Sequence, residues 1–149
     1  MKKENVLNFN NFLSTLKLNK FDKEIRSAII ANSFLAKKIV KEFEENVQLA
    51  RERYCDGLES EIEKLTQYRE KLLNAASDER NSITESCIKE CHNALRAERE
   101  LFEYIQNLQK EEVDEPFMKF NREAFVDQCI DGDIEVTSQL LETLEELFN

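Results

Sequence analysis

The sequence has very few of the residues that build tight turns. Its 149 residues include two glycines and one proline, together with one histidine and no tryptophan. Folds that contain β-sheets need many tight turns, which draw on glycine and proline, so this composition argues against them. Charged residues make up 35% of the chain, and helix formers dominate it. We therefore predict an all-α fold with long, surface-rich helices.

Long apolar runs are missing as well. No window approaches the ~20 apolar residues of a membrane span, and residues 1–12 lack the apolar stretch of a signal peptide. The cysteines are irregularly spaced, which predicts reduced, mostly buried thiols rather than a disulfide framework. They are Cys55, Cys87, Cys91 and Cys129. These features predict a cytoplasmic protein with no membrane segment.

The formal net charge of −10 is unevenly placed. Residues 1–54 carry a net charge of +4, residues 55–110 carry −4, and residues 111–149 carry −10. Such a gradient suggests that the acidic end contacts something basic, and the first candidate is the N-terminal third of the same chain.

Two long apolar stripes follow a short amphipathic segment at residues 7–17. Asp22 is a candidate N-cap for the first stripe, whose apolar residues recur every three or four positions as far as Leu72. The second stripe runs from Ile83 to Leu108, and Ser77 could cap its helix. Short loops join antiparallel neighbours. We therefore predict an antiparallel coiled-coil hairpin with its tip near 74–78, in which Cys87 faces Leu65.

Two other arrangements remain open for this region. Nothing in residues 74–82 forbids a helix, so one very long helix in an oligomer is an alternative. The first long helix could also break at residues 55–57, because Gly57 costs about 1 kcal/mol in a helix interior. Asp56 and Glu59 have the spacing of a capping box there. We favour the two-helix hairpin, and a kink at Gly57 is the first variation of it that we expect.

Two shorter helices are expected after the second stripe. Pro116 fits the first turn of a helix that runs to about Ile130. Gly132 is a candidate C-cap for that helix, and Asp133 is a candidate N-cap for a last amphipathic helix. Nine of the ten phenylalanines lie in residues 9–43 or 117–148. Bulky rings suit a globular core, so within a single domain we predict a head (1–43 with 111–149) and a hairpin stalk (44–110).

Two sets of candidate interaction residues follow from this arrangement. The register places three lysines at the neck opposite three acids, as surface pairs worth ~0–1 kcal/mol each. These are Lys37, Lys38 and Lys41 with Glu111, Asp114 and Glu115. The last helix could close the head core, or its apolar face could stay open for a partner. The candidate partner-binding residues are Leu140, Leu144, Leu147 and Phe148.

Patterns for catalysis, metal binding or cofactor binding are weak. Cys91 and His92 are adjacent, and adjacent helical side chains do not converge as a catalytic pair must. Cys87 and Cys91 share a helix face but lack a third metal ligand. Residues 127–138 resemble a calcium loop only faintly, because position three is Cys129 and position twelve is Ser138 in place of a bidentate Glu. The helix from Asp133 has no Lys or Arg, so nucleic acid would be repelled.

The function predicted from the sequence is therefore non-enzymatic. A two-helix stalk is poorly buried alone, which favours a homodimer acting as an oligomeric spacer or assembly factor for an unidentified protein partner. The alternative is an acidic inhibitor or assembly chaperone, of the kind encoded by phages and mobile elements, that occupies a basic partner surface. An enzyme would need a site built from carboxylates and cysteines, and no motif in the sequence indicates such a site.

Overall fold

The computed structural model describes residues 1–149 and confirms the all-helical prediction. No strand forms, and the only β-type pairings are two isolated bridges. Two short 3₁₀ helices, η1 (Leu18–Lys20) and η2 (Glu145–Leu147), accompany seven α-helices. The α-helices are α1 (Lys3–Thr15), α2 (Lys23–Tyr54), α3 (Glu59–Asn74), α4 (Arg80–Glu90), α5 (His92–Gln109), α6 (Arg122–Asp131) and α7 (Ser138–Leu144).

The chain divides into two compact units. Unit 1 consists of Met1–Glu44 with Leu108–Asn149, and unit 2 consists of Glu45–Asn107. None of the helices combines the length and the apolar character that crossing a bilayer requires. Because each unit has its own buried cluster, we describe the two separately.

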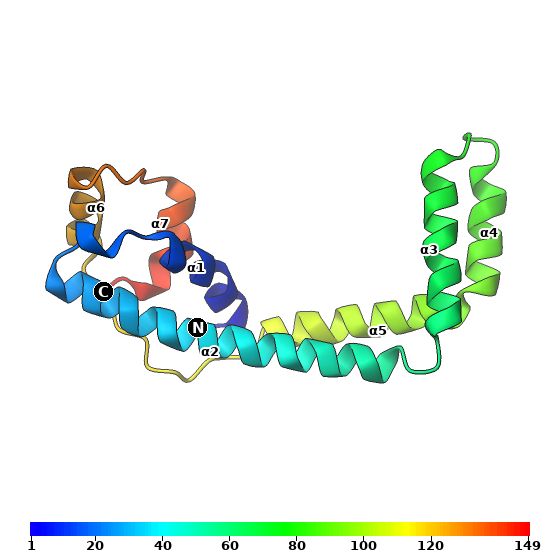
Figure 1. The fold of residues 1–149 in the computed structure, drawn as a ribbon, viewed down its shortest axis with the longest axis horizontal. Coiled ribbons are helices and arrows are strands. Elements are labelled where there is room, and N and C mark those ends of the chain that lie inside the picture. The colour runs from blue at the N-terminus through cyan, green and yellow to red at the C-terminus, as the bar shows by residue number, and fades with distance from the viewer. The chain divides into compact units, whose positions relative to one another are not determined.

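Unit 1 is built around aromatic side chains. α1, α6 and α7 gather on one side of the first half of α2 (Figure 1). Phe125 is fully buried, with ring centroids 5.4 Å from Phe120, 5.5 Å from Phe21 and 5.7 Å from Phe148. Burying a ring of this size stabilises a fold by ~1.5–3 kcal/mol. The core of unit 1 therefore joins α2 to the C-terminal segments.

The start of α2 is capped as the sequence predicts. Asp22 Oδ1 accepts a hydrogen bond from the Ile25 N–H at 2.9 Å, which satisfies one of the amides that a helix N-terminus leaves free. The other carboxylate oxygen accepts from Gln128 Nε2 at 2.8 Å, so the cap also ties α2 to α6. These hydrogen bonds lower the pKa of Asp22, the Ile25 amide contributing most.

Residues 110–121 do not form the first turns of a helix, which corrects the helix predicted to begin at Pro116. Their backbone groups bond to other parts of unit 1: the Lys3 N–H donates to Glu111 O, and the Val113 N–H donates to Met1 O. The fully buried Asn32 holds the same segment, donating to Met118 O at 2.8 Å and accepting from the Met118 N–H at 2.7 Å. α6 begins only at Arg122, after this segment has been fixed.

The turn after α6 also differs from the prediction. Gly132 does follow α6 as its C-cap, but Asp133 adopts a positive φ of 56° and is not an N-cap. α7 begins later, and Thr137 caps it through a hydrogen bond from the Leu140 N–H. Gly132 is needed for space, because a Cβ there would lie 2.9 Å from the Cβ of Lys20.

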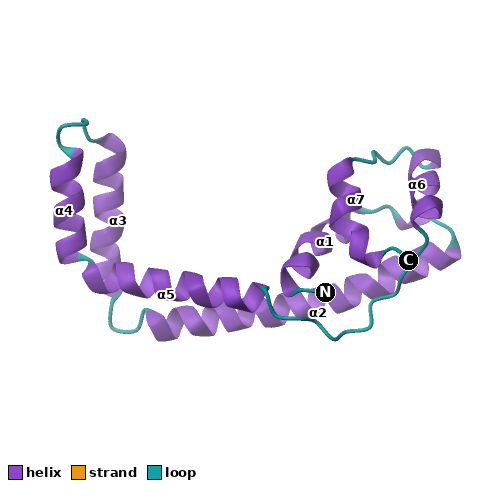
Figure 2. Cartoon of the chain, turned by 180° about the vertical axis from the view of Figure 1, so that it is seen from behind, coloured by secondary structure: helices purple, strands orange, loops and turns teal.

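Unit 2 contains an antiparallel pair of helices, α3 and α4, which lie side by side (Figures 1 and 2). The chain reverses between Asn74 and Arg80. The buried cluster of the unit is small: Leu65, Cys87, Cys91 and Ala94. Small side chains in this seam give little apolar burial.

Neither long stripe is a continuous helix. α2 ends at Tyr54 and α3 begins at Glu59, with Gly57 at a φ of 74° between them (Figure 2). The second stripe is interrupted at Cys91, which separates α4 from α5. The expected caps are also wrong, because Leu58 and Glu79 occupy the N-cap positions in place of Asp56 and Ser77, and neither makes a side-chain cap.

Candidate protein-docking groove

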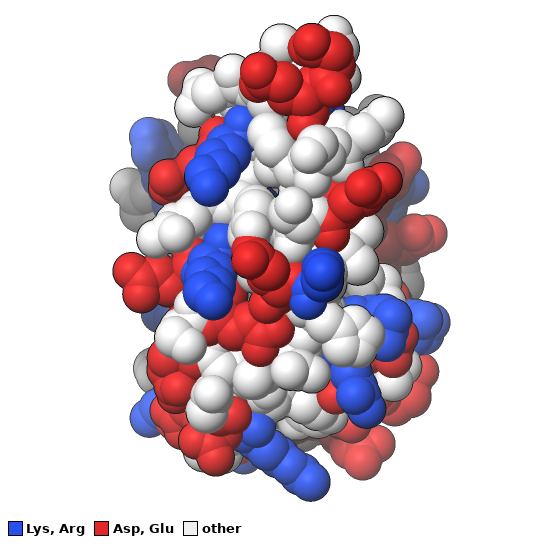
Figure 3. Space-filling view, turned by 90° about the vertical axis from the view of Figure 1, so that its right-hand side faces the viewer, with Lys and Arg blue, Asp and Glu red and all other residues white.

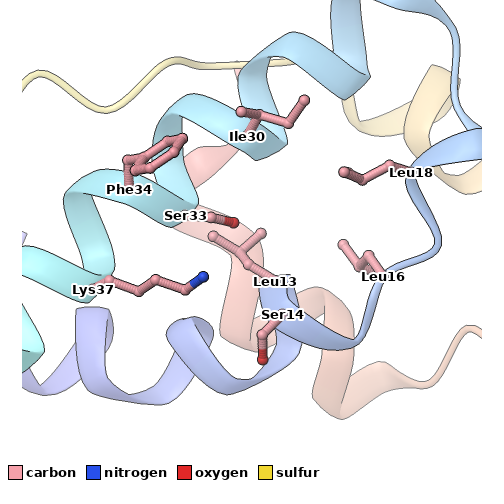
Figure 4. Close-up of a pocket in the computed structure, with 8 residues that line it drawn as sticks. All are labelled: Leu13, Ser14, Leu16, Leu18, Ile30, Ser33, Phe34 and Lys37. Atoms are coloured by element: carbon pink, nitrogen blue, oxygen red, sulfur yellow. The ribbon is translucent and has the colours of Figure 1, made fainter.

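An apolar hollow of unit 1 lies between the end of α1 and the middle of α2. It has a volume of about 250 Å³ and is open on one side. Leu13 and Ser14 border it from α1, while Ile30 and Phe34 border it from α2 (Figure 4). Leu16 and Leu18 lie at one end and Lys37 at the other. We call this feature the α1–α2 groove.

The local sequence explains why this groove is open. Asn32, Ala36 and Ile39 belong to the stripe of α2 that is buried in the core. Ile30 and Phe34 lie one turn apart, outside that stripe, so they cannot reach the core from the same helix. They are accordingly exposed, Ile30 by 39% and Phe34 by 73%.

Phe34 is the main departure of unit 1 from a buried aromatic core. A phenylalanine with 73% of its surface exposed leaves most of an aromatic ring in water. Single exposed apolar residues are ordinary, but Phe34 adjoins the exposed Ile30 and Leu18 around one hollow. An apolar cluster around a concavity is the usual form of a site that accepts an apolar side chain.

Lysines lie beside the apolar rim. Lys37 lines the groove, and Lys38 and Lys41 follow it on α2, all three exposed. No ion pair within 4.0 Å involves any of them. The groove thus combines apolar walls with uncompensated positive charge at one end.

The predicted neck pairs do not form. Glu111 pairs with Lys3 at 2.6 Å, while Asp114 and Glu115 have no ion pair. The Met1 ammonium donates a hydrogen bond to the Glu112 carboxylate at 2.8 Å. This hydrogen bond raises the pKa of the ammonium and lowers the pKa of Glu112. Because segment 110–121 runs beside the N-terminal residues, Glu111 and Glu112 pair with Lys3 and Met1 rather than with the lysines of α2.

The last helix and the residues after it bury three leucines in the core of unit 1. Leu140 is only 5% exposed, and Leu144 and Leu147 are fully buried in the core of unit 1. Phe148 packs edge-on against Phe120 at 5.4 Å. Burial of the three leucines fits the role of closing the core, while Phe148 stays partly exposed beside a surface hollow.

The cysteines and the histidine do not assemble into a reactive cluster. No three His, Cys, Asp or Glu side chains are placed to hold a metal ion. Burial raises the pKa of Cys129 to about 11, and burial together with the neighbouring Cys87 raises the pKa of Cys91. Both are therefore protonated thiols at neutral pH, the unreactive form.

Sequence reasoning identified the lysines but missed the apolar part of the groove. The sequence did contain a signal for the apolar part: Ile30 and Phe34 are large apolar residues spaced i, i+4 on a face that the core stripe does not use.

No family model matches the chain, and the searches of curated proteins and of solved structures likewise found no match.

Proposed function

We propose that the chain is a non-enzymatic interaction protein, in which unit 1 docks a segment of a partner and unit 2 acts as a coiled-coil spacer. The observation that carries this proposal is the α1–α2 groove, with Phe34 exposed at its rim. Interface anchors are enriched in aromatic residues that fill pockets, and unit 1 offers one ring and one hollow side by side.

The occupant we assign to the groove is an acidic amphipathic helix of a partner protein. The apolar walls accept one or two large side chains of such a helix, as in other helix-in-groove complexes. Lys37, Lys38 and Lys41 have no ion-pair partner within the chain, so carboxylates beside the apolar anchors would complement them. Charge complementarity of this kind favours an acidic segment over a basic one.

A synthetic helical peptide tests this assignment. The probe carries Leu and Phe at i, i+3, i+4 and i+7 with Glu elsewhere, and binding to the full chain is measured by titration calorimetry. Phe34→Ala should weaken binding about tenfold, because truncating an interface anchor costs more than ~1 kcal/mol. The matched control is Phe102→Ala, which truncates another exposed phenylalanine in unit 2.

The charge part of the assignment has its own test. Lys37→Glu with Lys38→Glu should weaken binding of the acidic peptide and remove most of its salt dependence. A Lys-substituted version of the peptide should bind the unaltered chain less tightly. Equal affinity for the acidic and basic peptides, or no effect of Phe34→Ala, would reject the acidic occupant.

The spacer role of unit 2 includes a proposed homodimer. The unit buries a small cluster yet exposes Leu49, Leu73, Ile88 and Phe102, each by more than half. A second copy packed along these helices would cover apolar surface that one chain leaves in water. Light scattering at low and high salt should then give twice the chain mass of 17.6 kDa. A monomer at both salt concentrations contradicts the homodimer and leaves the groove proposal standing.

One observation favours the alternative of an acidic surface that binds a basic partner. Of the twelve acids in residues 111–149, only Glu111, Glu112 and Glu146 form ion pairs. The acidic surplus does not extend to every surface, since both signs are interspersed on the face in Figure 3. Binding of a polylysine probe that is lost on neutralising Asp127 and Asp131 would favour this function over the groove.

A further inference from the structure

The helices of unit 2 are interrupted at one place. Glu61, in the first turn of α3, accepts a hydrogen bond from the Asn93 N–H in the first turn of α5, at 3.0 Å. The break at residues 55–58 and the break at Cys91 therefore lie next to each other in space. Within unit 2 the α3–α4 pair turns away from α5 there (Figure 1).

Gly57 is the one sequence signal for a break on the α2–α3 side, and the sequence around Cys91 offers none. Neither break contains proline, and the apolar stripes continue through both, by way of Leu58 on one side and Leu95 on the other. At Cys91 helical hydrogen bonds persist on both sides, from the Cys91 N–H to Cys87 O and from the Leu95 N–H to Cys91 O. A Cβ at Gly57 would have no atom within 4 Å of it, so the glycine is needed for its positive φ of 74° and not for a close contact.

The pairs on either side of the breaks share one register. The Tyr54 and Tyr104 rings lie 6.4 Å apart beyond the breaks, and Tyr68 donates a hydrogen bond to Glu90 within the α3–α4 pair. In an antiparallel pair of helices, the numbers of facing residues add to a constant total. The two pairs give the same total, so both fit a single antiparallel alignment of the two stripes. The Asn93–Glu61 pair at the bend adds to a total four lower, so the alignment on either side of the bend shifts by about one helical turn at the bend itself.

A bidentate ion pair departs from that register. Arg69 of α3 donates to both carboxylate oxygens of Glu98 of α5, at 2.8 and 2.6 Å. In a straight hairpin with the shared register, Glu98 would face Ser60, about nine residues from Arg69. That is about 14 Å along the helix axis at ~1.5 Å per residue, too far for the two side chains to meet. The ion pair therefore exists only when the hairpin is bent.

We propose that unit 2 is a two-position elbow, with Arg69–Glu98 as the latch that holds the bent position. When the latch opens, α2 can continue into α3 and α4 into α5, so that the two stripes run as straight helices. The latch is about half exposed on both side chains, which places it within reach of salt and of competing charged groups. The elbow would let a bound partner set the direction of the α3–α4 pair within unit 2.

A distance measurement across the elbow tests this proposal. Spin labels are attached to the full chain at Glu70→Cys and Glu103→Cys, both exposed, in a Cys55→Ser background. Arg69→Ala and Glu98→Ala should each move the label separation to longer values. The straight register places residues 70 and 103 about 22 Å apart along the axis alone. High salt should produce the same shift in the unaltered chain.

Two variants make the result specific. Arg96→Ala is the matched control, because Arg96 pairs with Glu100 within α5 and does not bridge the elbow. The charge exchange Arg69→Glu with Glu98→Arg should restore the short separation. Gly57→Ala should lengthen it, because alanine disfavours the positive φ of the turn and favours continuous helix. The proposal is overturned if the separations in Arg69→Ala and Glu98→Ala match those of the unaltered chain.

Discussion

Unit 1 and unit 2 are both helical, but they are stabilised differently. The core of unit 1 contains fifteen buried apolar residues, among them four phenylalanines, from segments at both ends of the chain. Unit 2 has a cluster of four, two of which are cysteines and one an alanine. Apolar burial scales with the area removed from water, so unit 1 carries most of the hydrophobic stabilisation. Unit 2 depends more on its helix propensity and on its ion pairs.

The same comparison explains where the exposed apolar residues matter. In unit 1 the most exposed large apolar residue, Phe34, lies with Ile30 and Leu18 around one hollow, while Met118 and Ile130 are exposed singly elsewhere. In unit 2 exposed apolar residues occur on the end of α2 and on α3, α4 and α5 alike. A local exception suggests a specific docking site, whereas a distributed exposure suggests a long helical contact.

The largest expected effect is the loss of stability when a core side chain is truncated, and it should differ between the two units. Phe125→Ala should destabilise the chain by about 3–5 kcal/mol, because it leaves a ring-sized cavity among Phe21, Phe120 and Phe148. Leu65→Ala, in the thin seam of unit 2, should cost about 2 kcal/mol, at the low end for such changes. Hydrogen exchange resolved by segment measures both. Equal loss of protection in both units after either change would contradict the comparison.

A smaller effect tests the polar tie inside unit 1. Asn32→Ala leaves the N–H and C=O of Met118 without their partner in a partly buried setting, which should cost about 1 kcal/mol. Exchange should accelerate most along residues 110–121, the segment that Asn32 holds. Asn8→Ala, at an exposed position of α1, is the matched control and should change stability by less than ~0.5 kcal/mol. If the two substitutions have equal effects, the tie does not hold the segment.

The smallest effect is a pH dependence in unit 2. The hydrogen bonds from Arg69 lower the pKa of Glu98 from its ordinary value of 4.5. A depressed pKa in the folded state means that the stabilisation is fully present above pH 4.5 and is lost as pH falls through the folded value. The side chains are about half exposed, so the loss should not exceed ~1 kcal/mol. NMR titration of Glu98 in the unaltered chain and in Arg69→Ala should show the shift only when Arg69 is present.

Some features were predictable because they are local. The scarcity of glycine and proline predicted helices throughout, and Asp22 was recognisable as an N-cap because its partner is three residues away. The buried stripe of α2 could also be read from spacing, since Ile25, Ile29 and Ala36 share one helix face. Each of these depends on neighbours within about one or two helical turns.

Other features were not predictable because distant segments compete for the same groups. Pro116 suggested a helix start, but the backbone of residues 111–118 bonds instead to the N-terminus and to Asn32. Nothing in the spacing around Cys91 marked an interruption. The sequence pointed to the lysines beside the groove but not to Phe34. The apolar pair Ile30 and Phe34, spaced i, i+4 outside the core stripe, could have revealed the apolar wall.

The sequence by itself determined that this chain is helical and which face of most helices is buried, because both follow from repeats of three and four residues. Only the tertiary structure decided where helices end and which charges pair. Asn32 meets Met118 across 86 positions, and Lys3 takes the carboxylate that had been expected to face Lys41. Hydrogen bonds and ion pairs form between whichever groups the packed core brings within about 3 Å, and periodicity along the chain carries no information about those encounters.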